Sequence, residues 1–169
     1  NMTGMSFEQY EYLFNFISSK NGINLLVFGL GRDSYMWNFQ ANKKGRTAFL
    51  EDVPHWIDQT AQENPGIEIW PVVYPTACRD HESLLKEYEE GNQKKLFPNW
   101  PLSISNTIWD IIIIDGPMGY NINNPGRMIP IASSFHFQKE QEHGDIFVHD
   151  ASRKIESKYS EYFFTKNNY

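Results

Sequence analysis

The chain has little cysteine, little basic charge and no long apolar run, and each shortage excludes a functional class. Cys78 is the only cysteine in 169 residues, which excludes an intrachain disulfide framework and a cysteine-based zinc site. Acidic residues outnumber basic ones by 21 to 15, so we expect no nucleic-acid-binding surface. No apolar run approaches the length of a membrane span, and no signal-peptide core opens the chain. We therefore expect a soluble domain, whose oligomeric state and compartment the sequence leaves open.

What the chain does contain is an alternation of helix-like and strand-like segments. This alternation predicts a parallel sheet covered by helices on both faces, within a single domain over residues 1–169. Strands are expected at 24–28, 46–51, 67–74, 109–115 and 145–149. Helices are expected at 7–17, 34–43, 54–64, 81–90 and 127–141 and from 153 onward. Residues 92–107 are interpreted as a surface connection, and residues 163–169 offer at most the start of one further strand.

The most informative segment is Leu25–Trp37, in which an apolar strand runs into Gly29-Leu30-Gly31 and then into a helix-like run. Glycines let a backbone turn sharply and approach a ligand closely, and the start of the next helix offers free N–H groups. Glu51 ends the next apolar run, about 20 residues further on, where a ribose-binding acid is found in such folds. Together these features predict a cofactor that contains adenosine.

The identity of that cofactor depends on the rest of the turn. A dinucleotide site requires a third glycine, but this chain has Ser34 at that position, three residues after Gly31. Asp33 also lies inside the loop, where its carboxylate would repel a pyrophosphate and attract the ammonium or sulfonium group of S-adenosylmethionine. The loop therefore favours the methyl donor over a nicotinamide cofactor.

Six segments in order carry a resemblance to a known family. They are VFGLGRDSYMW (27–37), GRTAFLED (45–52), VVYPT (72–76), WDIIIIDGPMGY (109–120), PGRM (125–128) and DIFVHDASRKIESKYS (145–160). This series closely resembles the glucuronoxylan 4-O-methyltransferase family of plant polysaccharide biosynthesis, the irregular-xylem group.

The resemblance implies an α/β, Rossmann-like class I methyltransferase fold with a mostly parallel central sheet. It also implies S-adenosylmethionine as donor, a sugar hydroxyl as acceptor and, if the plant family is a guide, a place in the Golgi lumen rather than the cytoplasm. Sheets of this class end with two further strands, which here are either cut short or absent from the fold.

The catalytic candidates are Asp115, His149 and Asp150, which follow two strands that lie side by side in class I methyltransferases. Two carboxylates in close approach raise one pKa or recruit a cation. Catechol-type O-methyltransferases resemble this layout, so the three residues are also candidate ligands for Mg²⁺, Mn²⁺ or Co²⁺. Two alternatives stay open: a metal-free site in which Asp115 or His149 is the general base, and a structural one in which Asp150 caps the next helix.

Further site residues are expected in the loops that follow strands. Tyr74 and Thr76 are candidates to contact the adenine of the cofactor, with an ordinary β-turn as the alternative. Tyr120 and Arg127 are candidates to bind the acceptor, and Arg127 could instead pair with a local carboxylate. The loops expected to shape the acceptor site are 92–107 and 116–126.

These observations favour an enzyme that moves a methyl group from S-adenosylmethionine to a carbohydrate hydroxyl. A nicotinamide-dependent oxidoreductase is the first alternative, and it requires a loop compatible with pyrophosphate. A non-catalytic carbohydrate-binding domain is the second, and it predicts that polar residues are missing from the carboxyl edge of the sheet. Glu51, Asp115 and Asp150 are all present at that edge.

Overall fold

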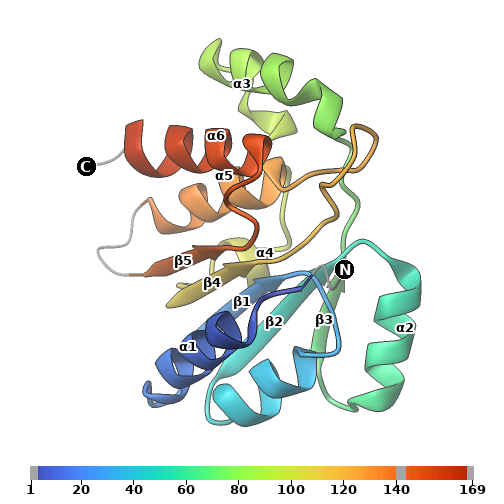
Figure 1. The fold of residues 1–169 in the computed structure, drawn as a ribbon, viewed down its shortest axis with the longest axis vertical. Helices are drawn as coiled ribbons and strands as arrows, with labels where there is room; N and C mark the ends of the chain where they lie inside the picture. Colours follow the sequence, from blue (N-terminus) through green and yellow to red (C-terminus); the bar gives the residue numbers. More distant parts are fainter. Residues whose placement is uncertain (1–3, 140–143, 167–169) are drawn as a thin grey trace.

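The computed structural model describes residues 4–139 and 144–166. Its centre is a sheet of five parallel strands in the order β3-β2-β1-β4-β5 (Figure 1). The strands are β1 (Asn24–Phe28), β2 (Arg46–Glu51), β3 (Glu68–Pro71), β4 (Ile111–Ile114) and β5 (Asp145–Val148). This architecture confirms the expected Rossmann-like α/β fold.

Helices cover both faces of the sheet (Figure 1). They are α1 (Phe7–Ser18), the π-helical η1 (Met36–Ala41), α2 (Pro54–Glu63), the short η2 (Cys78–Asp80), α3 (His81–Glu89), η3 (Gln93–Lys95), α4 (Leu102–Ser105), α5 (Met128–Gln138), α6 (Lys154–Glu161) and η4 (Tyr162–Lys166). A capping box formed by Ser6 and Gln9 starts α1. Among the described residues, no helix is long and apolar enough to cross a membrane.

Strand β4 lies deep in the hydrophobic core, since its four isoleucines are all buried. One apolar cluster joins the strands to α1 and η1 and includes Leu13, Ile17, Leu25, Val27, Trp37, Ile111 and Ile113. The other joins them to α5 and α6 and includes Leu26, Phe28, Ile112, Ile114, Ile129, Ile131 and Tyr159. Successive residues of one strand thus enter opposite clusters, as the pleat of a strand buried on both faces requires.

The expectations for residues 92–107, for β3 and for the C-terminal residues need correction. Residues 92–107 are more than a surface connection, since they form η3 and α4 and bury Leu96 and Ile104. The end of this segment also lies at the amino edge of the sheet, where Arg46 donates to the Thr107 hydroxyl (2.7 Å) and to the Ser103 carbonyl (3.1 Å). It precedes β4, so this end of it cannot border a site at the carboxyl edge.

The other two corrections concern the length of β3 and the possible strand after residue 163. Strand β3 ends at Pro71 instead of continuing to residue 74, because its neighbour in the sheet, β2, ends at Glu51 opposite Pro71; the Val72 amide makes the last hydrogen bond, to the Glu51 carbonyl at 2.8 Å. The possible further strand after residue 163 is replaced, up to Lys166, by the π-helical η4. Residues 167–169 of that expectation lie outside the described residues.

Candidate functional site

The loop after β1 crosses the loop after β4 with no room for a side chain between them. Gly29 has φ +114°, and a Cβ there would lie 3.1 Å from the Gly116 nitrogen. A Cβ on Gly116 would lie 2.8 Å from the Gly29 Cα. Since only glycine combines that φ angle with so close an approach, the two loops are held together at the carboxyl edge of the sheet.

Asp33 and Ser34 shape the rest of the glycine loop. The Ser34 hydroxyl accepts a hydrogen bond from the Gly31 amide at 3.0 Å, and the Trp37 indole N–H donates to Asp33 Oδ2 at 2.8 Å. A Cβ on Gly31 would lie 2.7 Å from Asp33 Oδ1, so this glycine makes room for the carboxylate. Burial raises the pKa of Asp33. A cationic ligand group beside this carboxylate would lower the pKa again.

Glu51 ties the loop after β2 to the glycine loop. Its carboxylate accepts hydrogen bonds from the amides of Leu30 (2.6 Å), Val53 (2.7 Å) and Asp52 (3.0 Å), and the residue is only 5% exposed. Burial raises its pKa, while these amides oppose the shift. Glu51 therefore has a structural role that sequence reasoning missed, and its binding of a ribose stays a prediction.

A small cavity joins the glycine loop to the acid after β4. It has a volume of about 60 Å³ and is lined by Gly29, Gly31 and Asp33 on one side and by Asp115 on another. Met5, from the segment before α1, also lines it. A glycine loop without room for side chains and a buried carboxylate fit the charged end of a cofactor such as S-adenosylmethionine.

The three catalytic candidates come together as the sequence predicts. Strands β4 and β5 end at Ile114 and Val148, so Asp115, His149 and Asp150 all lie just beyond them. His149 Nδ1 lies 2.6 Å from Asp115 Oδ1 and 3.4 Å from Asp150 Oδ2. Asp150 has φ +57°, a left-handed conformation that aspartate tolerates better than most residues. Arg153, not Asp150, is the N-cap residue of α6, so the capping alternative does not hold.

Arg127 lies between the two carboxylates instead of facing an acceptor. Its guanidinium lies 3.1 Å from Asp115 Oδ1 and 3.3 Å from Asp150 Oδ2, and it donates to the carbonyls of Asp115 (2.9 Å) and His149. Burial, to 4% exposure, lowers its pKa, and Asp115 and Asp150 raise it. The expectation that Arg127 binds the acceptor is therefore replaced by its alternative, pairing with local carboxylates.

This arrangement does not fit a divalent metal. The place of a cation between Asp115 and Asp150 is taken by the Arg127 guanidinium, which already compensates their charge. Among residues 4–139 and 144–166, no three histidine, cysteine or acidic side chains are placed to hold a metal ion. The expected Mg²⁺, Mn²⁺ or Co²⁺ site is thus not supported, and the metal-free alternative fits the observed contacts.

The remaining site candidates, Tyr74, Thr76 and Tyr120, differ in how exposed they are. Tyr74 is packed in the core without a partner for its hydroxyl, and Thr76 donates to the Pro125 carbonyl at 3.1 Å. Neither lines the cavity at the glycine loop, so their contact with adenine stays a prediction. Tyr120 is 64% exposed on the loop after β4, where it is accessible to an acceptor.

We call the group formed by Asp115, Arg127, His149, Asp150, Arg153 and Glu156 the charged cluster. Sequence reasoning missed two of its members, Arg153 and Glu156. Arg153 lies 2.7 Å from Asp150 Oδ2. Glu156 is 1% exposed, neither of its carboxylate oxygens has a hydrogen-bond partner, and burial raises its pKa while Arg127 and Arg153 lower it. The spacing of Asp150, Arg153 and Glu156, three residues apart, is a signal that could have suggested a common face at the start of the last helix.

Fold and site together define a Rossmann-like protein with a glycine loop and a charged cluster at the carboxyl edge of its sheet. The chain belongs to the IRX15/IRX15L/GXM family, whose model matches residues 8–169. It is 32% identical to glucuronoxylan 4-O-methyltransferase 3 of Arabidopsis thaliana over 95% of this chain and 58% of that protein. It is 34% identical to arabinogalactan O-methyltransferase 2 of the same plant over 94% of this chain and 60% of that protein. A more distant relative is protein IRREGULAR XYLEM 15, at 29% identity over 86% of this chain and 50% of that protein.

The chain therefore spans about 58–60% of the length of the first two relatives. No solved structure matches it.

Proposed function

We propose that this chain transfers a methyl group from S-adenosylmethionine to a hydroxyl of a polysaccharide sugar. The observation that carries the proposal is the shared cavity, which places Asp115 of the charged cluster against the glycine loop. The names of the relatives, glucuronoxylan and arabinogalactan O-methyltransferases, support the reaction class and the kind of acceptor.

The glycine loop would hold the amino-acid end of the donor. Its backbone is free of side chains at Gly29 and Gly31, and the Asp33 carboxylate would pair with the ammonium or sulfonium group. A nicotinamide cofactor is disfavoured because the same carboxylate would repel its pyrophosphate. When bound, S-adenosylmethionine supplies an electrophilic methyl group on sulfur.

Asp115 and His149 would take the proton from the sugar hydroxyl. Asp115 reaches the cavity with its side chain 27% exposed, whereas the His149 side chain is 7% exposed and lies behind it at 2.6 Å. The hydroxyl oxygen forms a bond to the methyl carbon as the carbon–sulfur bond breaks, and the hydroxyl proton passes to the Asp115–His149 pair. Arg127 fixes the orientation of the Asp115 carboxylate and so acts as a positioning residue.

The test of donor binding is the variant Asp33→Asn, which removes the charge and keeps the shape. S-adenosylhomocysteine carries the same ammonium group as the donor, and the loss of one charged hydrogen bond costs about 1.5–3 kcal/mol. We expect its Kd, measured by titration calorimetry, to rise at least about tenfold. Glu63→Gln, an exposed acid on α2, is the matched control and should leave the Kd unchanged.

Two results would contradict this assignment. One is an unchanged Kd for S-adenosylhomocysteine in Asp33→Asn. The other is binding of NAD by the wild-type chain as tightly as S-adenosylhomocysteine, which would favour the oxidoreductase.

A further inference from the structure

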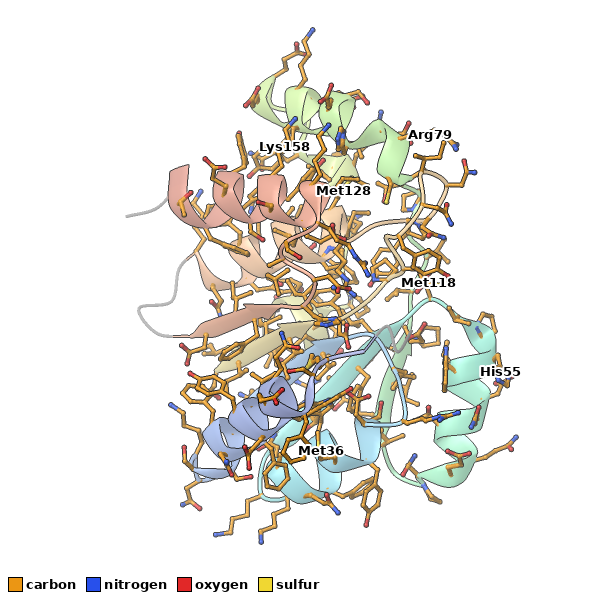
Figure 2. All side chains as sticks on the ribbon, in the orientation of Figure 1. Met36, His55, Arg79, Met118, Met128 and Lys158 are labelled. Carbon is orange, nitrogen blue, oxygen red and sulfur yellow. The ribbon has the colours of Figure 1, made fainter. Side chains whose placement is uncertain are left out.

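A second and larger cavity borders the part of the charged cluster that Arg153 and Glu156 form. It has a volume of about 570 Å³ and lies between the start of α3, the loop 119–122 and the start of α6. We call it the basic groove, because Arg79, Arg153 and Lys154 line it. In Figure 2, Arg79 lies at the start of α3, near the loop that carries Met118.

The charge of the basic groove is opposite to that of the whole chain. The chain has a formal net charge of −6, yet three cationic side chains meet here. The acid that lines the same groove is Glu156, which is almost completely buried in its wall. Asp80 lies 3.9 Å from Arg79, at a contact where both side chains are about half exposed and the attraction is screened by water.

The wall that carries Arg79 is held by hydrogen bonds across two loops. The amide of Arg79 donates to the Ile122 carbonyl at 3.0 Å, and its guanidinium donates to the Asn123 side chain. The amide of Cys78 donates to the Asn124 carbonyl at 2.8 Å. The Arg79 guanidinium is therefore held by its contact with Asn123 and by the hydrogen-bonded backbone at its base.

Another part of the lining carries Arg153 and Lys154, and Arg153 connects the groove to the charged cluster. Arg153 contacts Asp150, which in turn lies near His149 Nδ1 at 3.4 Å. Within the part of the chain that the structure describes, no carboxylate forms an ion pair with Lys154. Lys154 is thus available to an anion, and Tyr120 adds an exposed aromatic ring at the same groove.

We propose that the basic groove is a specificity subsite that binds the carboxylate of an acidic sugar in the acceptor, through Arg79 and Lys154. A guanidinium matches a carboxylate in geometry, an ammonium adds charge, and an exposed tyrosine ring is suited to pack on a sugar ring. The inference deepens the proposed function and rests on it. Acceptor recognition is thereby assigned to cations that line an open cavity and not to the buried Arg127.

The test compares two acceptors that differ only in charge. One probe is a xylo-oligosaccharide that bears one glucuronic acid, and the other is the same oligosaccharide with its carboxyl reduced to the alcohol. Binding to the chain saturated with S-adenosylhomocysteine is measured by calorimetry, and kcat/KM is measured for methyl transfer. We expect the wild-type chain to prefer the charged probe at least about tenfold, and to lose this preference at high salt.

The double variant Arg79→Ala/Lys154→Ala should bring the ratio of the two affinities close to one and leave the Kd of S-adenosylhomocysteine unchanged. Lys86→Ala, which removes an exposed cation of α3 outside the groove, should keep the preference. Equal affinity of the wild-type chain for both probes, retention of the preference in the double variant, or its loss in Lys86→Ala would each overturn the proposal.

Direct binding separates this inference from the proposed function. If S-adenosylhomocysteine does not bind and no methyl group is transferred, the proposed function fails. The affinities of the free chain for the two probes then still decide whether the groove selects a carboxylate.

Discussion

Replacing Arg127 by methionine should destabilise the fold by about 3–5 kcal/mol, the usual cost of breaking a buried ion pair. The Arg127 side chain is 5% exposed and lies between Asp115 and Asp150, with Glu156 nearby. Among the described residues, its loss leaves Asp115 without a guanidinium partner and leaves Arg153 as the one arginine that contacts Asp150. It also frees the carbonyls of Asp115 and His149. The free energy of unfolding, measured by urea titration, is the quantity to compare.

Two further variants show whether charge or geometry is responsible. Arg127→Lys keeps the charge but loses the planar fork, so it should recover only part of the stability. Lys86→Met, on the exposed face of α3, should change the free energy of unfolding by less than about 0.5 kcal/mol. An Arg127→Met chain as stable as this control would show that the cluster does not need the guanidinium.

Replacing Asp115 by asparagine should lower kcat for methyl transfer by about 10²–10⁴, the usual contribution of a general base. Asparagine keeps the shape of the side chain but cannot accept the hydroxyl proton. The Kd of S-adenosylhomocysteine should change by less than about threefold, which separates a catalytic effect from a loss of donor binding. Radiolabel transfer at saturating donor gives kcat, and calorimetry gives the Kd.

Asp145→Asn is the matched control for this prediction. Asp145 is exposed at the amino end of β5, at the opposite edge of the sheet from Asp115, so its variant should transfer methyl groups at the wild-type rate. An Asp115→Asn chain with unchanged kcat would remove Asp115 from the mechanism, and His149 would then be the remaining candidate base.

The sequence predicts strands β1 and β2 well because a local residue pattern marks the end of each, whereas β4 is shorter than the expected 109–115. The bounds of β1 and β2 agree with expectation, since glycine follows one apolar run and an acid ends the other. The expected helix over 34–43 instead becomes the π-helical η1 around the buried Trp37. Trp37 packs in the same core cluster as α1, with its ring 5.9 Å from that of Tyr10, and no local sequence pattern reports this contact.

The site also contains residues whose positions follow from the sequence pattern and residues whose positions do not. Topology alone brings Asp115, His149 and Asp150 together, because the carboxyl ends of neighbouring parallel strands meet at one edge. The burial of Arg127 among these residues depends on how α5 packs against the sheet, so its place at the start of a helix after the loop 116–126 does not identify its partners. The position of residues 92–107 was predictable, because a segment directly before a parallel strand must reach the amino edge.

The most direct test of the central claim is transfer of an isotopically labelled methyl group by the wild-type chain. The chain is incubated with labelled S-adenosylmethionine and glucuronoxylan, and the polysaccharide is hydrolysed and its sugars are analysed. We expect label in a methyl ether on a sugar oxygen, one S-adenosylhomocysteine formed per methyl group, and at least about a hundredfold less of both with Asp115→Asn. A chain that binds S-adenosylhomocysteine but leaves every sugar unlabelled, with glucuronoxylan and with arabinogalactan, would contradict the proposed function.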